Sequence, residues 1–268
     1  MFRRAIIGCC GGLLAGAPGW AQDDAAPEAA AADLSRPLVE FPHPLITEIF
    51  FSVPASGGDA SGDGQRSPAG DEFVELMNPH DRPINLVGYE LSDRPTASQF
   101  RFRFPDLVLA PGEVAVVFNG HDCQWRGPVG DDLRAPEAPH GLFEGAWVFT
   151  ARAASEYVSF ANTAEFVLLT SPAGLPVHAI EWGHPDDTPP PETGTLERVP
   201  AVRGRSLQRV APGGPLWEHP RTMDTPDGVL TFDLPCSPGI PLPGWSAAEA
   251  SEDDPAVRQP DGAALPDR

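Results

Sequence analysis

The segment Asp59-Ala-Ser-Gly-Asp-Gly64 carries the residue types that bind calcium. Side-chain oxygens stand at its first, third and fifth positions and glycine at the sixth, as in the first half of an EF-hand loop. The twelfth position, where a bidentate glutamate belongs, is Gly70, and Asp71 and Glu72 come one and two residues late. Two interpretations of residues 59–72 therefore stay open: an atypical calcium site, or a plain hairpin loop of Gly, Ser and Asp.

Other metal-ligating residue types occur in loops. They stand in His121-Asp122-Cys123 and in His184-Pro185-Asp186-Asp187, and neither has the spacing of a known metal motif. The chain has no Gly-x-Ser-x-Gly elbow and no glycine-rich phosphate loop. We therefore expect no cofactor and no catalysis. The alternative is a secreted metal-dependent hydrolase that uses the segment 121–158.

Glu75 is a carboxylate between apolar neighbours in an expected strand. General acid–base catalysis by carboxylates needs a partner group, and none is evident beside it. A structural role next to Asn78 is the simpler interpretation.

The cysteines bear on export and on cross-linking. The chain holds four cysteines, and Cys9 and Cys10 fall in the N-terminal segment described below. Cys123 and Cys236 then remain as a candidate disulfide, because exported chains meet an oxidising compartment. Two separate thiols are the other possibility, since sequence does not show that the side chains meet.

Tryptophans offer a possible binding surface. These side chains could form an exposed patch that stacks sugars or binds a protein, or they could pack in the core or at its rim. They are Trp125, Trp147, Trp182, Trp217 and Trp245.

The N-terminus has the features of a secretory signal. Arg3 and Arg4 precede a short apolar run, and Ala21 offers a cleavage site before Gln22, so residues 1–21 are an expected signal peptide. The run is too short to span a bilayer, which takes roughly 20 residues. We expect an extracytoplasmic protein, periplasmic, secreted or attached to the cell surface, with no stable membrane insertion after cleavage.

Charge excludes some partners. The formal net charge is −20, and the chain has no lysine. Nucleic-acid binding relies on clustered Lys and Arg, so we expect no nucleic-acid partner.

The elements that position these residues are short strands. The period-two stretch with Phe100, Phe102 and Phe104 predicts a strand with its three rings in the core. The same patterns predict strands over Leu45–Val53, Phe73–Met77, Ile84–Leu91, Gln99–Phe104, Val114–Phe118, Phe166–Thr170, Pro176–Trp182 and, as the last, Arg205–Val210. The Pro-rich segments 185–202 and 212–233 should lie at sheet edges or ends.

The ends of the chain differ in composition from its middle. Residues 22–44 are rich in Ala, Pro and acid and predict a flexible linker, and residues 244–268 predict a disordered acidic tail. One all-β domain over residues 45–243, with an insertion at about 121–158, is expected between them.

The order of the strand motifs is similar to that of the lamin tail domain family. The resemblance rests on Asp71-Glu-Phe-Val-Glu-Leu-Met-Asn-Pro79, Ile84-Asn-Leu-Val-Gly-Tyr-Glu-Leu-Ser-Asp93, Leu109-Ala-Pro-Gly-Glu-Val-Ala-Val-Val-Phe118 and Phe166-Val-Leu-Leu-Thr-Ser-Pro-Ala-Gly174. It implies an immunoglobulin-like antiparallel β-sandwich with long irregular loops. It also marks Glu75, Asn78, Gly88, Pro111 and Gly112 as structural motif positions.

The resemblance also implies a function class. It points to a bacterial, exported, non-catalytic binding or scaffolding module, with an unidentified protein or cell-surface partner. Arg205-Ser-Leu-Gln-Arg-Val210 and Ser237-Pro238-Gly239 resemble further elements of bacterial members.

Overall fold

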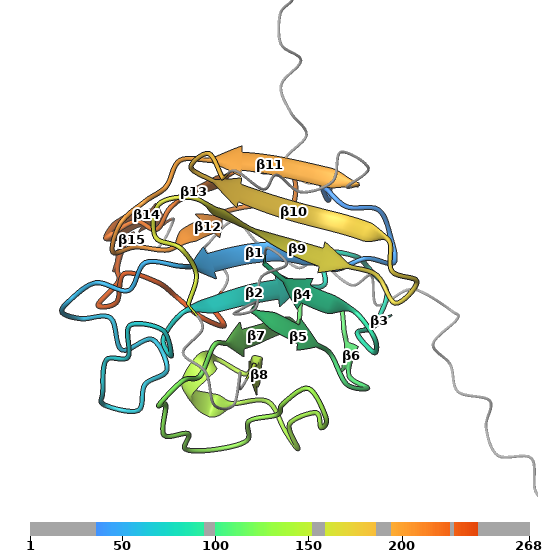
Figure 1. Ribbon diagram of the computed structural model, residues 1–268, viewed down its shortest axis with the longest axis horizontal. Coiled ribbons are helices and arrows are strands. Elements are labelled where there is room, and N and C mark those ends of the chain that lie inside the picture. The colour runs from blue at the N-terminus through green and yellow to red at the C-terminus, as the bar shows by residue number, and fades with distance from the viewer. Residues whose placement is uncertain (1–35, 94–99, 152–158, 186–193, 226–227, 241–268) are drawn as a thin grey trace, which may run out of the picture. The chain divides into compact units, whose positions relative to one another are not determined.

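A computed structural model describes residues 36–93, 100–151, 159–185, 194–225 and 228–240. The described strands form two larger sheets, ordered β13-β12-β1-β2-β7-β8 and β11-β10-β9-β4-β5 (Figure 1). The first sheet contains β1 (Leu45–Phe50), β2 (Phe73–Met77), β7 (Val114–Phe118), β8 (Trp147–Thr150), β12 (Leu207–Arg209) and β13 (Leu216–Glu218). The second contains β4 (Glu90–Ser92), β5 (Arg101–Arg103), β9 (Glu165–Thr170), β10 (Pro176–Trp182) and β11 (Thr195–Val199).

Two short strand pairs complete the described strands. They are β3 (Ile84–Asn85) with β6 (Val108–Leu109), and β14 (Thr222–Thr225) with β15 (Gly228–Thr231). Helical structure among the described residues is limited to the 3-10 turn η1 (Gly141–Phe143). No helix in those ranges is long and apolar enough to cross a membrane.

The core between the two sheets confirms the predicted β-sandwich. Side chains of both sheets share one apolar cluster, with Leu76 and Val117 from the first and Val167 and Ile180 from the second. The predicted aromatic strand is β5, which is shorter than expected and holds Phe102, and Phe100 and Phe104, which flank it, are buried with Phe102 as predicted. The ring of Phe102 packs edge-on against that of Phe104, with 4.9 Å between centroids. Val39 also belongs to this core, although it falls inside the predicted linker.

The first sheet is buried on both faces. Successive side chains of a strand point to opposite faces, yet every residue of β2 and β7 is buried. The inner face meets the second sheet. The outer face, with Phe73, Val116 and Phe118, is covered by Phe143 and Cys236, which come from loops far away in the sequence. This outer cover positions the candidate site.

The predicted strand Ile84–Leu91 is wrong as one element. The chain forms β3, turns, and then forms β4 in a different sheet. At the turn the amide of Tyr89 donates to the carbonyl of Leu86 at 3.0 Å. Gly88 has a φ of +81°, a conformation that glycine adopts without strain. The apolar pattern spans the turn because residues on both sides of it are buried.

Each sheet has a parallel strand at one edge, a departure from the predicted antiparallel arrangement. β8 runs parallel to β7, and β11 runs parallel to β10. A parallel neighbour requires a long crossover connection, usually of a dozen or more residues. Residues 119–146 and 183–194 are these connections. The long loops of the sequence are thus a consequence of the topology.

The segment Arg205–Val210 supplies β12, but it is not the last strand as predicted, because β13, β14 and β15 follow it. The described parts of the Pro-rich segments supply the edge strands β11 and β13, as predicted, and the second segment also supplies the separate pair β14 and β15.

A buried polar network joins the two sheets. The ring Nδ1 of His178 accepts the amide of Ile46 at 3.3 Å, so its Nε2 carries the proton and donates to Glu197 at 2.7 Å. Arg209 donates to both carboxylate oxygens of Glu197 and to the carbonyl of Gly214. Burial lowers the pKa of His178, which fits this neutral tautomer. Burial alone would raise the pKa of Glu197, but the hydrogen bonds from His178 and Arg209 lower it.

Candidate functional site

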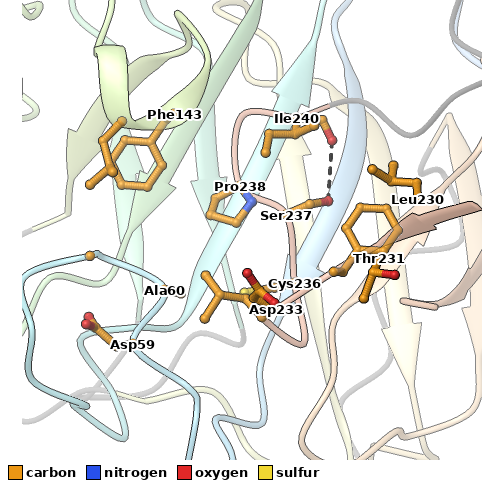
Figure 2. A pocket seen from close by; sticks show the side chains of 14 residues that line it. Asp59, Ala60, Phe143, Leu230, Thr231, Asp233, Cys236, Ser237, Pro238 and Ile240 are labelled. Carbon is orange, nitrogen blue, oxygen red and sulfur yellow. Dashed lines mark hydrogen bonds between the residues drawn. The ribbon is translucent and has the colours of Figure 1, made fainter. Parts of the chain in front are cut away.

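An open cavity of about 330 Å³ lies in the outer cover of the first sheet (Figure 2). Three separate segments line it: Asp59, Ala60 and Gly62; Leu142 and Phe143; and Leu230 to Leu234, Cys236 to Pro238 and Ile240. Most of these side chains are apolar. Asp59 and Asp233 are the charged residues among them, and no described lining residue is basic.

The rim of the cavity is apolar and exposed. The exposed fractions are 60% for Leu142, 38% for Leu230 and 38% for Ile240. In Figure 2, Phe143 and Leu230 lie on opposite sides of Pro238. Exposed apolar residues that gather around one cavity are typical of binding surfaces, whereas single exposed ones are common on any protein.

The turn η1 fixes Leu142 at this rim. His140 caps the turn, since its Nδ1 accepts the amide of Leu142 at 3.2 Å and its Nε2 lies 2.7 Å from the carbonyl of Arg126. Gly62 lies directly beneath Leu142, because a Cβ at this position would stand 2.5 Å from a methyl carbon of Leu142. A side chain at position 62 would displace the exposed end of Leu142, and the φ of +70° there is a conformation that favours glycine.

Two buried carboxylates hold the floor of the cavity. Glu48 of β1 and Glu75 of β2 are paired across the two strands. Glu48 accepts the amide of Ser237 at 3.0 Å and the hydroxyl of Ser206. Glu75 accepts the amide of Gly239 at 2.8 Å and the hydroxyl of Thr47 at 2.7 Å. The segment Ser237–Gly239 is thus fastened to the sheet through side chains.

Both carboxyls hold their protons unusually well. Burial raises the pKa of Glu75 to about 7, although hydrogen bonds from Thr47 and Gly239 oppose the shift. Burial, and then the charge of Glu75, raise the pKa of Glu48 well above its ordinary value, against the opposing hydrogen bonds of Ser206 and Ser237. Two carboxylates this close are not both ionised at low cost. Because their oxygens accept hydrogen bonds from Ser237 and Gly239, the two carboxyl groups have a structural role: they hold the floor of the cavity against the first sheet.

The predicted disulfide is absent from the structure, in which Cys123 and Cys236 are free thiols. Each sulfur has its own surroundings. Cys123 packs where a side chain on Gly70 would touch it, and Cys236 is enclosed in the apolar cover of the sheet. Burial raises the pKa of Cys123 to about 12 and that of Cys236 well above its ordinary value. Thiols this hard to ionise are poor nucleophiles.

The acidic loop 59–72 uses its carboxylates to organise itself. Asp59 accepts the amides of Asp63 and Gly64 at 3.2 and 2.9 Å. Asp71 accepts the amides of Ser61 and Ser67 at 2.8 and 2.6 Å. These carboxylates thus bind amides of their own loop. Within the described residues, no group of three or more His, Cys, Asp or Glu is placed to hold a metal ion.

The two other candidate metal segments are separate loop residues. Nδ1 of His121 lies 3.1 Å from a carboxylate oxygen of its neighbour Asp122. His184 is exposed, and Asp186 and Asp187 lie outside the described residues. Residues 152–158 of the predicted insertion also lie outside them.

The chain matches the family model of the Lamin Tail Domain over residues 46–184. The match spans half of the sequence and includes the strands from β1 to β10 apart from Leu45, whereas β11, β12 and β13 of the two sheets follow it. The chain belongs to the lamin tail domain family. A search of the curated proteins gives no match.

The lamin tail motif positions have structural roles. The side-chain amide of Asn78 donates to the carbonyls of Arg82 and Leu109 at 2.7 and 3.0 Å, and so fixes the turn after β2. The Pro111-Gly112 turn docks on the same residue, because the amide of Gly112 donates to the carbonyl of Asn78 at 2.9 Å. Glu75 fastens the floor of the cavity, as described above.

The tryptophans do not form one platform. Trp182 is buried and stacks on Phe51, with 4.3 Å between ring centroids. Trp125 packs against Phe118, and Trp147 is half-buried, with its Nε1 3.3 Å from a carboxylate oxygen of Glu113. Trp217 is exposed on β13, and Trp245 lies outside the described residues.

Sequence reasoning missed the cavity and its rim residues Leu142, Leu230 and Ile240. The available signal was that each is an apolar residue in a Gly- or Pro-rich segment without strand periodicity. Much of the cavity wall, from residue 230 to 240, also lies beyond the lamin tail match.

Proposed function

We propose that this lamin tail domain is an exported, non-catalytic binding module that holds a protein partner at the cavity of the outer cover. The observation that carries the proposal is the exposed apolar rim of Leu142, Leu230 and Ile240 around an open cavity. Removing such side chains from water is favourable by roughly 25 cal/mol per Å² of apolar surface, from which the entropic cost of association is subtracted.

The surroundings of the cavity support binding over acid–base or thiol chemistry. The carboxyls of Glu48 and Glu75 lie beneath the floor and are occupied by backbone amides and hydroxyls. The thiol of Cys236 is kept neutral by burial. Export is supported by Arg3, Arg4, the apolar run and Ala21.

Export and binding are testable together in the cells that make the protein. N-terminal sequencing of the product outside the cytoplasm should begin at or near Gln22. A photo-cross-linking amino acid at position 142 should join the exported protein to a partner. The same residue at position 133 is the control, because Leu133 is 87% exposed but does not line the cavity.

Intact protein beginning at Met1 in the cytosol would refute export. Equal adducts from positions 142 and 133, or no adduct from position 142, would refute binding at the cavity.

A further inference from the structure

We infer that the partner presents an extended, basic segment that inserts one apolar side chain into the cavity. This inference rests on the proposed function, and it names the chemistry of the partner from the charge, edge and size of the site.

The charge of the site favours a basic segment. Asp59 and Asp233 line the cavity, and no described lining residue is basic. Glu144 follows Phe143 directly in the chain, and the whole chain has a net charge of −20. A positively charged segment is drawn toward this surface, and an acidic one is repelled.

The strand beside the cavity favours an extended segment. Leu230 and Thr231 of the cavity wall belong to β15, whose four residues are all exposed. Among the described residues, β14 and β15 pair with each other and with no other strand. A strand edge without a strand neighbour offers backbone donors and acceptors to an added strand, while an adjacent cavity takes one of its side chains.

The size of the cavity favours one side chain with its neighbouring backbone. A volume of about 330 Å³ lies at the lower end of the roughly 300–1,000 Å³ found for ligand pockets. The apolar floor around Phe143 and Pro238 suits an aliphatic or aromatic side chain, and the half-buried Asp59 and exposed Asp233 suit a flanking Lys or Arg.

Three synthetic peptides test the inference on the intact protein: acetyl-Thr-Arg-Leu-Arg-Thr-amide, the same peptide with both Arg replaced by Glu, and the same peptide with Leu replaced by Gly. Binding is measured by isothermal titration calorimetry at low and at high salt. We expect the first peptide to bind on the order of tenfold or more tightly than either of the others. Its affinity should fall as salt rises.

Matched variants locate the binding. Asp233→Asn should weaken the Arg-Leu-Arg peptide about two- to fivefold, because an exposed charge pair contributes little. Asp132→Asn, an exposed acid that does not line the cavity, should leave the affinity unchanged. Leu142→Ser should weaken binding of the Arg-Leu-Arg peptide, because it removes apolar surface from the rim without adding a charge, whereas Leu133→Ser should leave binding unchanged.

Equal binding of the Arg and Glu peptides would overturn the inference about charge while the cavity remained a binding site. Equal binding of the Leu and Gly peptides would overturn insertion of a side chain. Binding that appears only after the chain is cut behind Ile240 would show that the protein's own C-terminal segment is the occupant, and would overturn the external partner. No binding by any form would overturn the inference, and the cross-linking experiment would still test the proposed function separately.

Discussion

The substitution Glu75→Gln separates the charge of the buried acid pair from its hydrogen bonds. A glutamine carbonyl oxygen can accept the amide of Gly239, and its NH₂ can donate to the hydroxyl oxygen of Thr47, so both contacts of Glu75 have a replacement. The substitution removes only the ionisable group, so position 75 no longer gains or loses a proton as pH changes.

The magnitude follows from the raised pKa of Glu75, which is about 7 in the folded protein against an ordinary value of 4.5. The folded state holds this proton at pH values where the unfolded state has released it. The carboxyl therefore stabilises the fold fully at low pH, and this contribution is lost as pH rises from about 5 to about 8. A shift of this size corresponds to about 3 kcal/mol.

The assay is urea unfolding of the wild type and the variant at pH 5 and pH 8, followed by tryptophan fluorescence. We expect the two proteins to have similar unfolding free energies at pH 5. At pH 8 the variant should be more stable by up to about 3 kcal/mol. The quantity compared is the difference in unfolding free energy between variant and wild type at pH 5 and at pH 8. Titrating groups that do not interact with Glu75 contribute equally to both proteins and cancel, whereas the repulsion between Glu75 and Glu48 remains in the difference. The exposed Glu137→Gln is the control and should show no such change.

The reasoning would be refuted if the difference between Glu75→Gln and the wild type were the same at both pH values. It would also be refuted if the unfolding free energy of the variant fell relative to that of the wild type as pH rose.

Three further predictions concern the core, the network between the sheets and the thiols. Phe102→Ala should cost about 3–5 kcal/mol of unfolding free energy in urea, because its ring is fully buried, and a neutral result would contradict the packing described. Arg209→Met should cost about 3–5 kcal/mol, since it leaves Glu197 partly buried without its cation, and adding Glu197→Gln should recover part of the loss; no recovery would contradict the ion pair. In protein lacking residues 1–21, Cys123 and Cys236 should give two reactive thiols after denaturation without reductant, as expected from their free state, and a lower count would reveal a disulfide.

The sequence predicted elements whose pattern is local. The alternation of Phe100, Phe102 and Phe104 around β5 and the apolar run of β7 each depend on a few neighbouring residues. Both strands were confirmed, and the predicted side chains are buried. The hairpin of β9 and β10 around Ser171 to Gly174 was also confirmed. In each case the side-chain period and the turn residues are sufficient signals.

The sequence did not predict features that depend on distant segments meeting. Glu75 and Gly239 are far apart in the chain, and nothing near either residue indicates that the carboxylate of one accepts the amide of the other. The parallel pairing of β8 with β7 was not predicted, because the long connection between the two strands has no regular pattern in the sequence. The cavity was missed for the same reason, since residues 59–62, 142–143 and 230–240 form it together.

Hydrogen–deuterium exchange with the Arg-Leu-Arg peptide tests most directly whether the cavity is the binding site. Saturating peptide should slow exchange in segments 59–62, 142–143 and 228–240, and should leave a second cavity, lined by residues that include Ile84, Tyr89 and Leu175, unchanged. Protection confined to that second cavity, or no protection in the three segments, would contradict binding at the cavity of the outer cover.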